Sequence, residues 1–548
     1  MRVISEGPHQ KPPAPWGIAL VTKGDRLLGI ATDGDIRRAI LAGKPLTTPI
    51  GDIMTRNPMT IQWNPSAGTM LRELHKKIKE RNVAESKFHH VITVDSKGNL
   101  VDIVTPLELW KHSDVQVRTA AVVGLGYVGL TLALTLAEFG IQVIGVDVNR
   151  KILGSLKKGI PHFFEKGLSA LLKKHIGKNL LVRERFKANE SDIYVLCVGT
   201  PVGPDGKAVT TYIADAAHEI GRVLKHHDLI ILRSTVPIGI TRSIVIPMLE
   251  KTSGLKAGED FLIAFAPERT VEGKALEELR SLPQVIGGLN RESFEATAQF
   301  FRVFAPTIVA VDTLEEAESV KLLNNAFRDL SFAFANEFAQ LASEHTISAR
   351  KVIRAANEGY PRNPIPLPSP GVGGMCLVKD PWLLVASGKR SVTPRLPRLS
   401  REINENMIDF VCSLVDRHAR KSGTGKRTRI FLLGMAFKGK PETSDIRFST
   451  SVDILRKLQK KYPSITIADP LADAKELKAL KAKVVPSPKE GFQNADCVLV
   501  LTNHPSFSEL DIHSLASSMR QPGFLFDPWG LYSKEELLQL KQIQYSTL

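Results

Sequence analysis

The stretch RTAAVVGLGYVGLTLALTLAEFGIQVIGVDVNR, residues 118–150, runs from an apolar segment through a glycine turn and a helix-like segment to a second apolar segment. Gly124, Gly126 and Gly129 form the pattern G-x-G-x-x-G at the turn. The first glycine permits a tight turn, the second lets a pyrophosphate approach the backbone, and the third lets helix and strand pack closely. The stretch therefore predicts a dinucleotide-binding strand–turn–helix–strand unit, with phosphates at the helix N-terminus.

An acidic residue completes this fingerprint. Asp147 lies 147 − 129 = 18 residues after Gly129, at the predicted end of the second strand, where a carboxylate accepts ribose hydroxyls. Such an acid repels a 2′-phosphate, which favours NAD, whereas the nearby Arg150 keeps NADP open as an alternative. The candidate cofactor-binding residues of this stretch are Gly124, Leu125, Gly126, Tyr127, Val128, Gly129, Asp147 and Arg150.

The whole chain of 548 residues is long enough for three or four domains. Strand-like and helix-like segments alternate up to about residue 313, which predicts a parallel, doubly wound α/β sheet. A helical stretch follows, and then a second such sheet, in which RIFLLGMAFKG at 429–439 echoes TAAVVGLGYVG at 119–129. The predicted domains are an N-terminal module at 1–115, a Rossmann domain at 118–313, a central helical region at 314–421 and a second Rossmann-like domain at 426–548.

The first 115 residues contain an internal repeat. LLGIATDGDI at 27–36 parallels NLVDIVTPLEL at 99–109, each ending in a strand and a helix. This repeat resembles a CBS-domain pair, an α+β module that senses adenine nucleotides and holds their ribose on a T-x-x-D turn. The residues that match this turn are Thr32, Asp35, Thr105 and Glu108. The first repeat lacks its opening strand and helix, so nucleotide binding and a purely packing role both stay open.

Composition excludes several classes of function. A count of 73 Lys and Arg against 57 Asp and Glu gives a net charge of +16, which favours anionic partners. The charges are interspersed and aromatics make up only 6%, so we expect no nucleic-acid partner. Residues 119–137 are uncharged over a length that suggests a membrane span, but the glycines divide them. With four cysteines, no CxxC pair and no signal-peptide pattern, we expect a cytoplasmic protein with neither membrane nor metal site.

Two local patterns need separating from real sites. GMAFKGK at 434–440 fits the phosphate loop G-x-x-x-x-G-K, but Pro441 follows instead of Ser or Thr, which argues against an NTPase. Of the four cysteines, only Cys376 follows a glycine loop, GVGG, with Lys379 close behind. A nearby cation favours the thiolate, so Cys376 is a candidate nucleophile, although an inert loop cysteine stays possible. The cysteines in apolar segments, expected to be inert, are Cys197, Cys412 and Cys497.

Seven motifs occur in a fixed order between residue 118 and the C-terminus. They are GLGYVGL at 124–130, VGTP at 198–201, STVPIG at 234–239, APER at 266–269, KLLNNA at 321–326, GVGGMCLVKDP at 371–381 and GMAFKG…SDIR at 434–447. In this order they resemble the UDP-glucose/GDP-mannose dehydrogenase family. Members of the family oxidise a nucleotide-sugar C6 alcohol to a carboxylate with two NAD+. The resemblance implies two Rossmann-like domains, joined by a helical dimerisation region, in a homodimer.

The resemblance also assigns catalytic roles. Cys376 would capture the aldehyde as a thiohemiacetal, which is oxidised to a thioester. Asp380 and Lys321 would handle the alcohol proton through water. Asn325 lies one helical turn beyond Lys321, and its amide would donate to the developing oxyanion.

Further positions follow from the same resemblance. Glu268 matches the acid that serves thioester hydrolysis, and Thr235 matches a hydroxyl that positions water. Arg362 matches an arginine supplied across the dimer interface. The implied substrate contacts are Glu268, Arg269, Lys321, Asn325, Arg362, Gly373, Phe437 and Lys438. The implied further cofactor contacts are Thr200, Thr235, Lys379 and Arg447.

The sugar is less firmly indicated than the reaction. APER together with GVGG and KDPW favours UDP-N-acetylglucosamine or UDP-N-acetylmannosamine and a role in polysaccharide biosynthesis. Lys379 resembles the UDP-glucose enzymes, so UDP-glucose is the alternative, although the segment 438–447 departs from those enzymes by being longer. Two further rivals are a two-electron β-hydroxyacid dehydrogenase and an adenylate-sensing regulatory protein with an inactive dehydrogenase portion.

Overall fold

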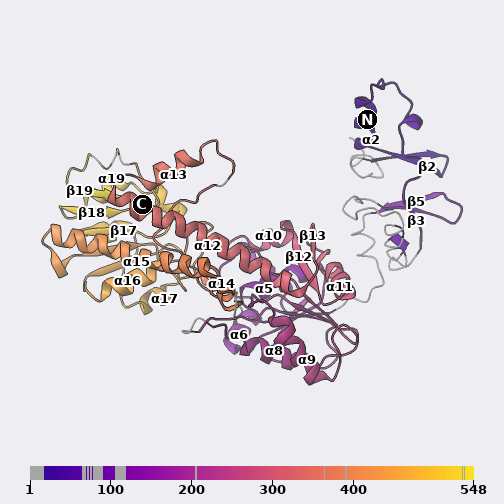
Figure 1. The fold of residues 1–548 in the computed structure, drawn as a ribbon, viewed down its shortest axis with the longest axis horizontal. Helices are drawn as coiled ribbons and strands as arrows, with labels where there is room; N and C mark the ends of the chain where they lie inside the picture. Colours follow the sequence, from indigo (N-terminus) through magenta and orange to yellow (C-terminus); the bar gives the residue numbers. More distant parts are fainter. Residues whose placement is uncertain are drawn as a thin grey trace. The chain divides into compact units, whose positions relative to one another are not determined.

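The computed structural model describes residues 18–64, 70, 73, 74, 77, 91–104, 119–203, 207–362, 364–388, 392–533, 535, 537 and 539–548. The chain divides into two units, Met1–Arg118 and Thr119–Leu548, which are drawn as ribbons in Figure 1. Each unit is described by itself below.

The first unit contains a hairpin and a small three-stranded sheet. β1 (Ile18–Lys23) pairs antiparallel with β2 (Arg26–Thr32), and α2 (Asp33–Leu41) follows directly. The remaining described elements are η2 (Ile50–Asp52), β3 (Thr60–Gln62), β4 (Val91–Val94) and β5 (Leu100–Val104). β3 was not predicted and is parallel to β4, which is antiparallel to β5. The sequence of residues 66–82 predicts a helix, but most of these residues lie outside the described ones.

The second unit opens with an eight-stranded sheet in the order β13-β12-β11-β10-β9-β6-β7-β8. Its strands are β6 (Ala120–Val123), β7 (Val143–Val146), β8 (Leu180–Arg183), β9 (Ile193–Leu196), β10 (Leu229–Leu232), β11 (Leu262–Phe265), β12 (Gln284–Gly288) and β13 (Ile308–Val311). Its helices are α5 (Tyr127–Glu138), α6 (Arg150–Lys157), α7 (Leu168–His175), α8 (Thr211–Gly221), η4 (Thr241–Val245), α9 (Ile246–Ser253), α10 (Ala275–Ser281) and α11 (Arg291–Phe301). Strands β6, β7, β9 and β10 are buried at every residue, as parallel strands covered on both faces are.

The expectation of a wholly parallel sheet was wrong at one pairing, so that β12 and β13 run opposite to the other six strands. β12 pairs antiparallel with β11, whereas the other neighbours in this sheet are parallel. The connection from β11 to β12 contains the APER motif and the short α10, and it returns from the carboxyl edge of β11 without crossing the sheet. The reversed strand therefore keeps residues 266–283 at the edge where ligands bind in such folds.

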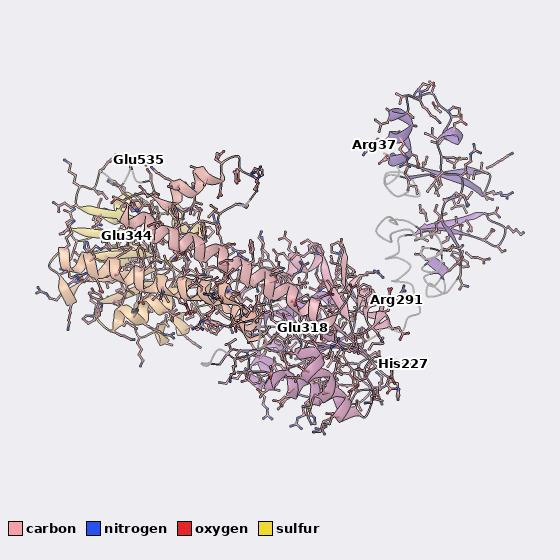
Figure 2. All side chains as sticks on the ribbon, in the orientation of Figure 1. Arg37, His227, Arg291, Glu318, Glu344 and Glu535 are labelled. Carbon is pink, nitrogen blue, oxygen red and sulfur yellow. The ribbon has the colours of Figure 1, made fainter. Side chains whose placement is uncertain are left out.

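Four helices form the middle of the second unit. They are α12 (Leu314–Glu344), α13 (Ala349–Asn357), α14 (Met375–Ala386) and α15 (Arg395–Lys421). α12 begins with a capping box formed by Thr313 and Glu316, and it packs against both α14 and α15. Figure 1 shows α12 running from the first sheet to the second, and Figure 2 labels Glu318 and Glu344 toward its two ends. The central helices thus link the two sheets.

The C-terminal sheet has six parallel strands in the order β16-β15-β14-β17-β18-β19. They are β14 (Ile430–Leu433), β15 (Ile465–Ala468), β16 (Lys483–Val484), β17 (Cys497–Val500), β18 (Gly523–Phe526) and β19 (Ile543–Ser546). The helices are η5 (Gly425–Arg427), α16 (Thr450–Gln459), α17 (Ala474–Ala479), α18 (Pro488–Phe492), η6 (Pro505–Glu509) and α19 (Ile512–Ser517). One face of this sheet shares a core with α15 and the end of α12, through residues such as Ala339, Ala342 and Val411.

The uncharged stretch at 119–137 forms β6, the glycine turn and most of α5. Among the helices that the structure describes, none combines the length and the apolar character needed to span a bilayer.

Candidate active site

The glycine turn after β6 has the geometry that a bound pyrophosphate requires. Gly124 has φ +87°, and a Cβ there would lie 3.0 Å from the backbone of Cys197 and Val198. A Cβ on Gly129 would lie 1.8 Å from the carbonyl oxygen of Gly124, so only glycine lets α5 pack against the turn. A Cβ on Gly126 would meet no atom of the described chain within 4 Å. The space above Gly126 is therefore open to a ligand, and the turn fits a dinucleotide.

Asp147 lies at the carboxyl end of β7 and is tied to the same turn. Its Oδ2 accepts from the N–H of Leu125 at 2.8 Å, and its Oδ1 accepts from the N–H of Asn149 at 2.8 Å. The Leu125 side chain is buried, so this residue serves the turn through its backbone N–H. Arg150 is largely exposed, and its guanidinium donates to Glu184 at 3.0 and 3.1 Å. The carboxylate thus faces the cofactor turn, while the arginine is engaged by another acid.

Tyr127 connects the turn to a loop of the APER segment. Its hydroxyl donates to Glu165 Oε2 at 2.6 Å, and the same carboxylate accepts from the N–H groups of Gly273 and Ala275 at 2.7 and 3.0 Å. Burial and the charge of Glu165 raise the pKa of Tyr127. Tyr127 is therefore a neutral donor that fixes the loop preceding α10; Val128 follows it in the first turn of α5.

The loops after β9 and β10 lie beside each other. Thr200 donates its hydroxyl to the carbonyl oxygen of Thr235. The buried Glu318 of α12 accepts from the backbone N–H groups of Gly239 and Thr241 and from the Thr241 hydroxyl, the last at 2.5 Å. Glu318, labelled in Figure 2, thereby fastens α12 to the STVPIG loop.

Lys321, Asn325 and Asp380 form one group, in which Lys321 and Asp380 are buried and Asn325 is half-buried. Lys321 and Asn325 lie on α12, and Asp380 lies on α14 with no exposed surface. Asn325 Nδ2 donates to Asp380 Oδ2 at 2.6 Å, and Lys379 Nζ donates to Asp380 Oδ1 at 2.6 Å. The structure therefore brings these four side chains, which come from two helices, to one centre.

Cys376 occupies the first turn of α14, a helix that continues through Pro381, so the loop position expected for it was wrong. The residue is solvent-accessible, but the surrounding protein disfavours the charged form and raises the pKa of the thiol. Among the nearby charges, Lys321 has the largest effect and lowers the pKa of the thiol. Asp380 raises this pKa, and Lys379 lowers it by a smaller amount. Lys321 and Lys379 thus favour the thiolate, as the sequence predicts for nearby cations, but their effect on the pKa of Cys376 is smaller than the opposing effect of the surrounding protein.

The second sheet contributes a segment to this centre. Lys438 Nζ donates to the carbonyl oxygen of Glu272 at 2.6 Å, and the Thr443 hydroxyl donates to Glu272 Oε1 at 2.7 Å. Burial lowers the pKa of Lys438 and raises that of Glu272. The charge of Glu272 raises the pKa of Cys376, and the charge of Cys376 raises that of Lys438. The residues 438–443 thus reach from the C-terminal sheet to the loop that precedes α10.

The glycines before Cys376 pack against the same segment. A Cβ on Gly373 would lie 2.7 Å from the carbonyl oxygen of Phe448, and one on Gly374 would lie 2.7 Å from the Phe437 ring. The N–H of Gly374 donates to the Phe448 carbonyl oxygen at 2.9 Å. The GVGG sequence is therefore required by the close approach of the second sheet to the N-terminus of α14.

Three models of one family cover this unit. The NAD binding domain of the UDP-glucose/GDP-mannose dehydrogenase family matches residues 118–305, its central domain 315–406 and its UDP binding domain 431–534.

The chain belongs to this family. A UDP-N-acetyl-D-mannosamine dehydrogenase from Methanococcus maripaludis is 34% identical over 405 residues, which cover 73% of this chain and 89% of the relative. An NDP-N-acetyl-D-galactosaminuronic acid dehydrogenase from Ralstonia solanacearum is 32% identical, over 77% of this chain and 98% of the relative. The solved UDP-D-ManNAc dehydrogenase from Pyrococcus horikoshii is 30% identical, with a TM-score of 0.69 over 76% of this chain and 96% of that one.

The dehydrogenase is an oxidoreductase that uses NAD, and its C-terminal domain belongs to the UDP-binding type. The predictions of the family, of the cofactor and of enzymatic activity are confirmed. The N-terminal unit lies outside all three family matches, so its resemblance to a CBS pair stays a prediction.

Arg447 lies on the cofactor side of the dehydrogenase. It pairs with Asp445 at 2.6 Å, which raises its pKa. Burial lowers the pKa of His162. The negative charge of Asp147 raises this pKa, and the positive charge of Arg447 lowers it further. Since both charges act on one imidazole, Arg447 of the second domain faces the Asp147 edge of the first.

Two predicted arginines have other partners within the chain. Arg269 donates to the carbonyl oxygen of Pro283. Arg362 lies over the ring of Tyr360, with 5.6 Å between its Cζ and the ring centroid. Neither of these contacts links Arg269 or Arg362 to the group around Cys376 within the same chain.

The predicted nucleotide turn of the first unit is occupied by its own helix cap. Asp35 Oδ2 accepts from the Thr32 N–H at 2.9 Å and from the Thr32 hydroxyl at 2.7 Å, and its Oδ1 accepts from Arg38 at 2.6 Å. Thr105 and Glu108 lie outside the described residues. Among the described residues, no group of histidine, cysteine or acidic side chains could hold a metal ion.

Sequence reasoning missed four charged residues near the site. Arg233 and Glu272 lie in loops that also carry family motifs. Arg233 directly follows a strand and Glu272 lies four residues after Glu268, and these positions were the signals that could have identified them. Asp329 and Arg401 form a buried ion pair at 2.8 Å between α12 and α15, and Arg401 also donates to the carbonyl oxygen of Val372. Charged residues within helices gave no signal that they would support the Cys376 loop.

Proposed function

We propose that this dehydrogenase oxidises C6 of a UDP-N-acetylhexosamine from alcohol to carboxylate, with Cys376 as a covalent nucleophile. The observation that carries the proposal is the gathering of Cys376, Lys321, Asn325 and Asp380 between the NAD turn and the segment of Lys438. A two-electron alcohol dehydrogenase has no use for a thiol at this place, whereas a four-electron reaction needs to hold the aldehyde.

The first half of the reaction converts the alcohol to an aldehyde. NAD+ supplies the hydride acceptor when it is bound at the Gly124–Gly129 turn. Asp380, held by Asn325 and Lys379, accepts the alcohol proton through a water positioned by Thr235. Lys321 and the Asn325 amide donate to the oxyanion that develops on the sugar oxygen.

The second half passes through the thiol. The Cys376 sulfur adds to the aldehyde carbon and its proton leaves toward the Asp380 group, which gives a thiohemiacetal. Loss of a second hydride gives a thioester on Cys376. Glu268 then serves as base for the water that hydrolyses the thioester, releasing the uronate and the Cys376 thiol. Two molecules of NADH are formed for each sugar.

The relatives support the choice of sugar. Those named above act, by their names, on N-acetyl-D-mannosamine and N-acetyl-D-galactosaminuronic acid nucleotides. We propose UDP-ManNAc or UDP-GlcNAc as substrate, with polysaccharide biosynthesis as the use of the product, and UDP-glucose as the alternative. A solved UDP-glucose dehydrogenase from Pyrobaculum islandicum is 28% identical with a TM-score of 0.68, so overall shape does not discriminate between these sugars.

The test is the NADH yield of the purified dehydrogenase with limiting UDP-ManNAc, UDP-GlcNAc, UDP-glucose or GDP-mannose. We expect two NADH per sugar with one acetylated hexosamine, and we expect Cys376→Ser to abolish the overall reaction. One NADH per sugar, or full activity of Cys376→Ser, would refute the four-electron route. Two NADH with UDP-glucose alone would replace the proposed sugar and keep the mechanism.

We further propose a homodimer built on α12. Four large apolar residues recur along one side of this helix and are half or more exposed: Leu323, Phe327, Phe334 and Leu341. Light scattering should give a dimer for the wild type and a monomer for Phe327→Asp, with Tyr212→Asp on α8 as an exposed aromatic control. Mixing inactive Arg362→Ala with inactive Cys376→Ser should restore activity if the arginine acts across the interface, because a mixed dimer then holds one intact site.

We also propose that the N-terminal unit regulates this activity by binding an adenine nucleotide. Binding would have to displace the hydrogen bonds of Asp35 to Thr32 and Arg38, which cap α2. An effect of AMP or ATP on the rate, lost in Asp35→Ala, is the expected result. Tight adenylate binding by a chain without turnover on any of the four sugars would instead favour a regulatory protein with an inactive dehydrogenase portion.

A further inference from the structure

Arg233 is a charged side chain that the mechanism above does not use, although it is almost completely buried against one of the catalytic residues. The exposed fractions of the Arg233 and Glu268 side chains are 1% and 3%. Arg233 Nε donates to Glu268 Oε2 at 3.0 Å, and Nη2 donates to the same oxygen. Both hydrogen bonds therefore converge on one carboxylate oxygen.

The guanidinium is held in place by three strands. Arg233 directly follows β10, and its Nη1 donates at 3.2 Å to the carbonyl oxygen of Ala266, after β11. Nη1 also donates at 2.9 Å to Oε1 of Gln284, the first residue of the reversed strand β12. The Phe301 ring lies under the guanidinium, with 5.1 Å between Cζ and the ring centroid. This arginine is thus fixed before any ligand binds, at no further entropic cost.

The arrangement treats the two oxygens of Glu268 differently. Oε2 accepts both hydrogen bonds from Arg233, whereas Oε1 accepts from the N–H of Thr270 at 2.7 Å and has no bond to the guanidinium. An sp² oxygen has two lone pairs, so Oε1, which Arg233 does not contact, is left to other donors. Burial on its own would raise the pKa of Glu268, but Arg233, and after it Lys321, bring it below its ordinary value.

We propose that Arg233 is a positioning residue for thioester hydrolysis, which holds Oε2 of Glu268 and thereby aims Oε1 at the attacking water. The inference rests on the proposed function, because it assumes an acyl group on Cys376. The water oxygen bonds to C6 while its proton passes to Glu268 Oε1; the C6–S bond then breaks, and the Cys376 sulfur takes up that proton. The step consumes one water, transfers no electrons and yields the carboxylate and a further proton.

A purely structural role would have different consequences. A buried ion pair that only joins β10 to the APER loop would, on removal, lower the stability and slow all chemical steps together. A positioning role predicts that the two hydride transfers stay intact and that hydrolysis alone is slowed. The pH dependence of hydrolysis would also change, because Glu268 without its guanidinium takes up a proton at higher pH.

The experiment compares Arg233→Lys and Arg233→Met with the wild type. Arg233→Lys offers one donor in place of a fixed pair and keeps the charge, so it serves even where Arg233→Met does not fold. Arg280→Met is the matched control, since Arg280 also stacks on a phenylalanine, Phe139, but makes no contact with Glu268. The three measurements are the pre-steady-state burst of NADH, the intact mass of the protein during turnover and the pH profile of kcat.

We expect both variants to release two NADH per site in the burst and to accumulate a mass adduct on Cys376, with kcat lower by about 10- to 100-fold. The acid limb of kcat should move to higher pH by about one unit or more, and further in Arg233→Met than in Arg233→Lys. A reduced burst without adduct, or an unmoved acid limb, would overturn the inference in favour of a structural role. A wild-type enzyme that never forms the adduct with any sugar would instead refute the proposed function.

Discussion

The two sheets of the dehydrogenase begin with the same backbone device and use it for different purposes. Each first strand ends in a glycine with positive φ, +87° at Gly124 and +94° at Gly434. Each turn is tied to an aspartate at the end of the next strand. Asp147 accepts from the N–H of Leu125, and Asp469 accepts from those of Met435 and Ala436.

The turns differ in what lies above them. A Cβ on Gly126 meets open space, whereas the corresponding residue of the second turn, Ala436, already carries a Cβ and is buried. The first turn enters α5 at once and leaves room for a pyrophosphate. The second turn is filled by protein and continues, outside any helix, through Phe437 and Lys438 to Glu272. One local geometry therefore serves either to admit a ligand or to carry side chains to a distant centre.

The largest expected effect separates the two turns directly. Gly439→Ala should lower the free energy of unfolding by about 3 kcal/mol or more, because its methyl group collides with backbone atoms. Gly126→Ala should leave stability unchanged and weaken NAD binding about tenfold, since its methyl group occupies the cofactor space. Denaturant unfolding and NAD titration measure the two quantities. A loss of stability in Gly126→Ala as large as that in Gly439→Ala would contradict the open space above the first turn.

The reach of the second turn can be tested at Lys438. Lys438→Met should lower kcat about 100-fold, because the cation that contacts Glu272 and lies near Cys376 is lost. NAD affinity should not change, since Lys438 lies away from the Gly126 turn in sequence and contacts. Lys440→Met, at an exposed position of the same segment, is the control. A normal kcat for Lys438→Met would show that the second turn does not contribute to catalysis through Lys438.

The two aspartates should respond unequally to amidation. Asp469 accepts four backbone N–H groups, from Met435, Ala436, Leu471 and Ala472, so an Asn there points a donor at donors. Asp469→Asn should cost about 2 kcal/mol of stability. Asp147→Asn, with two such bonds, should cost less stability and should mainly weaken NAD binding. Thermal unfolding with and without NAD distinguishes them, and a larger stability loss at Asp147 would contradict the comparison.

The smallest effect concerns the thiol between the two turns. Since burial raises the pKa of Cys376, its thiolate fraction at pH 7 lies below that of an ordinary cysteine. Alkylation by iodoacetamide should therefore be slow at pH 7 and should keep accelerating as the pH rises past the pKa of a free cysteine. Lys321→Met should slow it a few-fold further, because Lys321 lowers the thiol pKa. Rapid alkylation at neutral pH would indicate a resting thiolate.

Local features were predictable from sequence, and features that depend on distant partners were not. The glycine turns, Asp147 and the Lys321–Asn325 spacing depend on a few consecutive residues, so the sequence predicted them. The direction of β12 was not encoded in its apolar pattern, because parallel and antiparallel strands of a buried sheet read alike. The Arg233–Glu268 and Asp329–Arg401 pairs join residues 35 and 72 positions apart, so no local pattern announces them.

The way α12 is mounted has a consequence for how the centre is completed. Its 31 residues extend over about 46 Å, with Glu318 fixed to the first domain and Ala339 and Ala342 in the core of the second. Lys321 and Asn325 both lie on this helix, so the distance between them does not depend on the angle between the two sheets. Lys438 comes from the C-terminal sheet, so its place beside Glu272 depends on how the second domain packs against the rest of the unit. The active site therefore combines two side chains whose spacing is set within one helix with a cation whose position is set by the packing of a different domain.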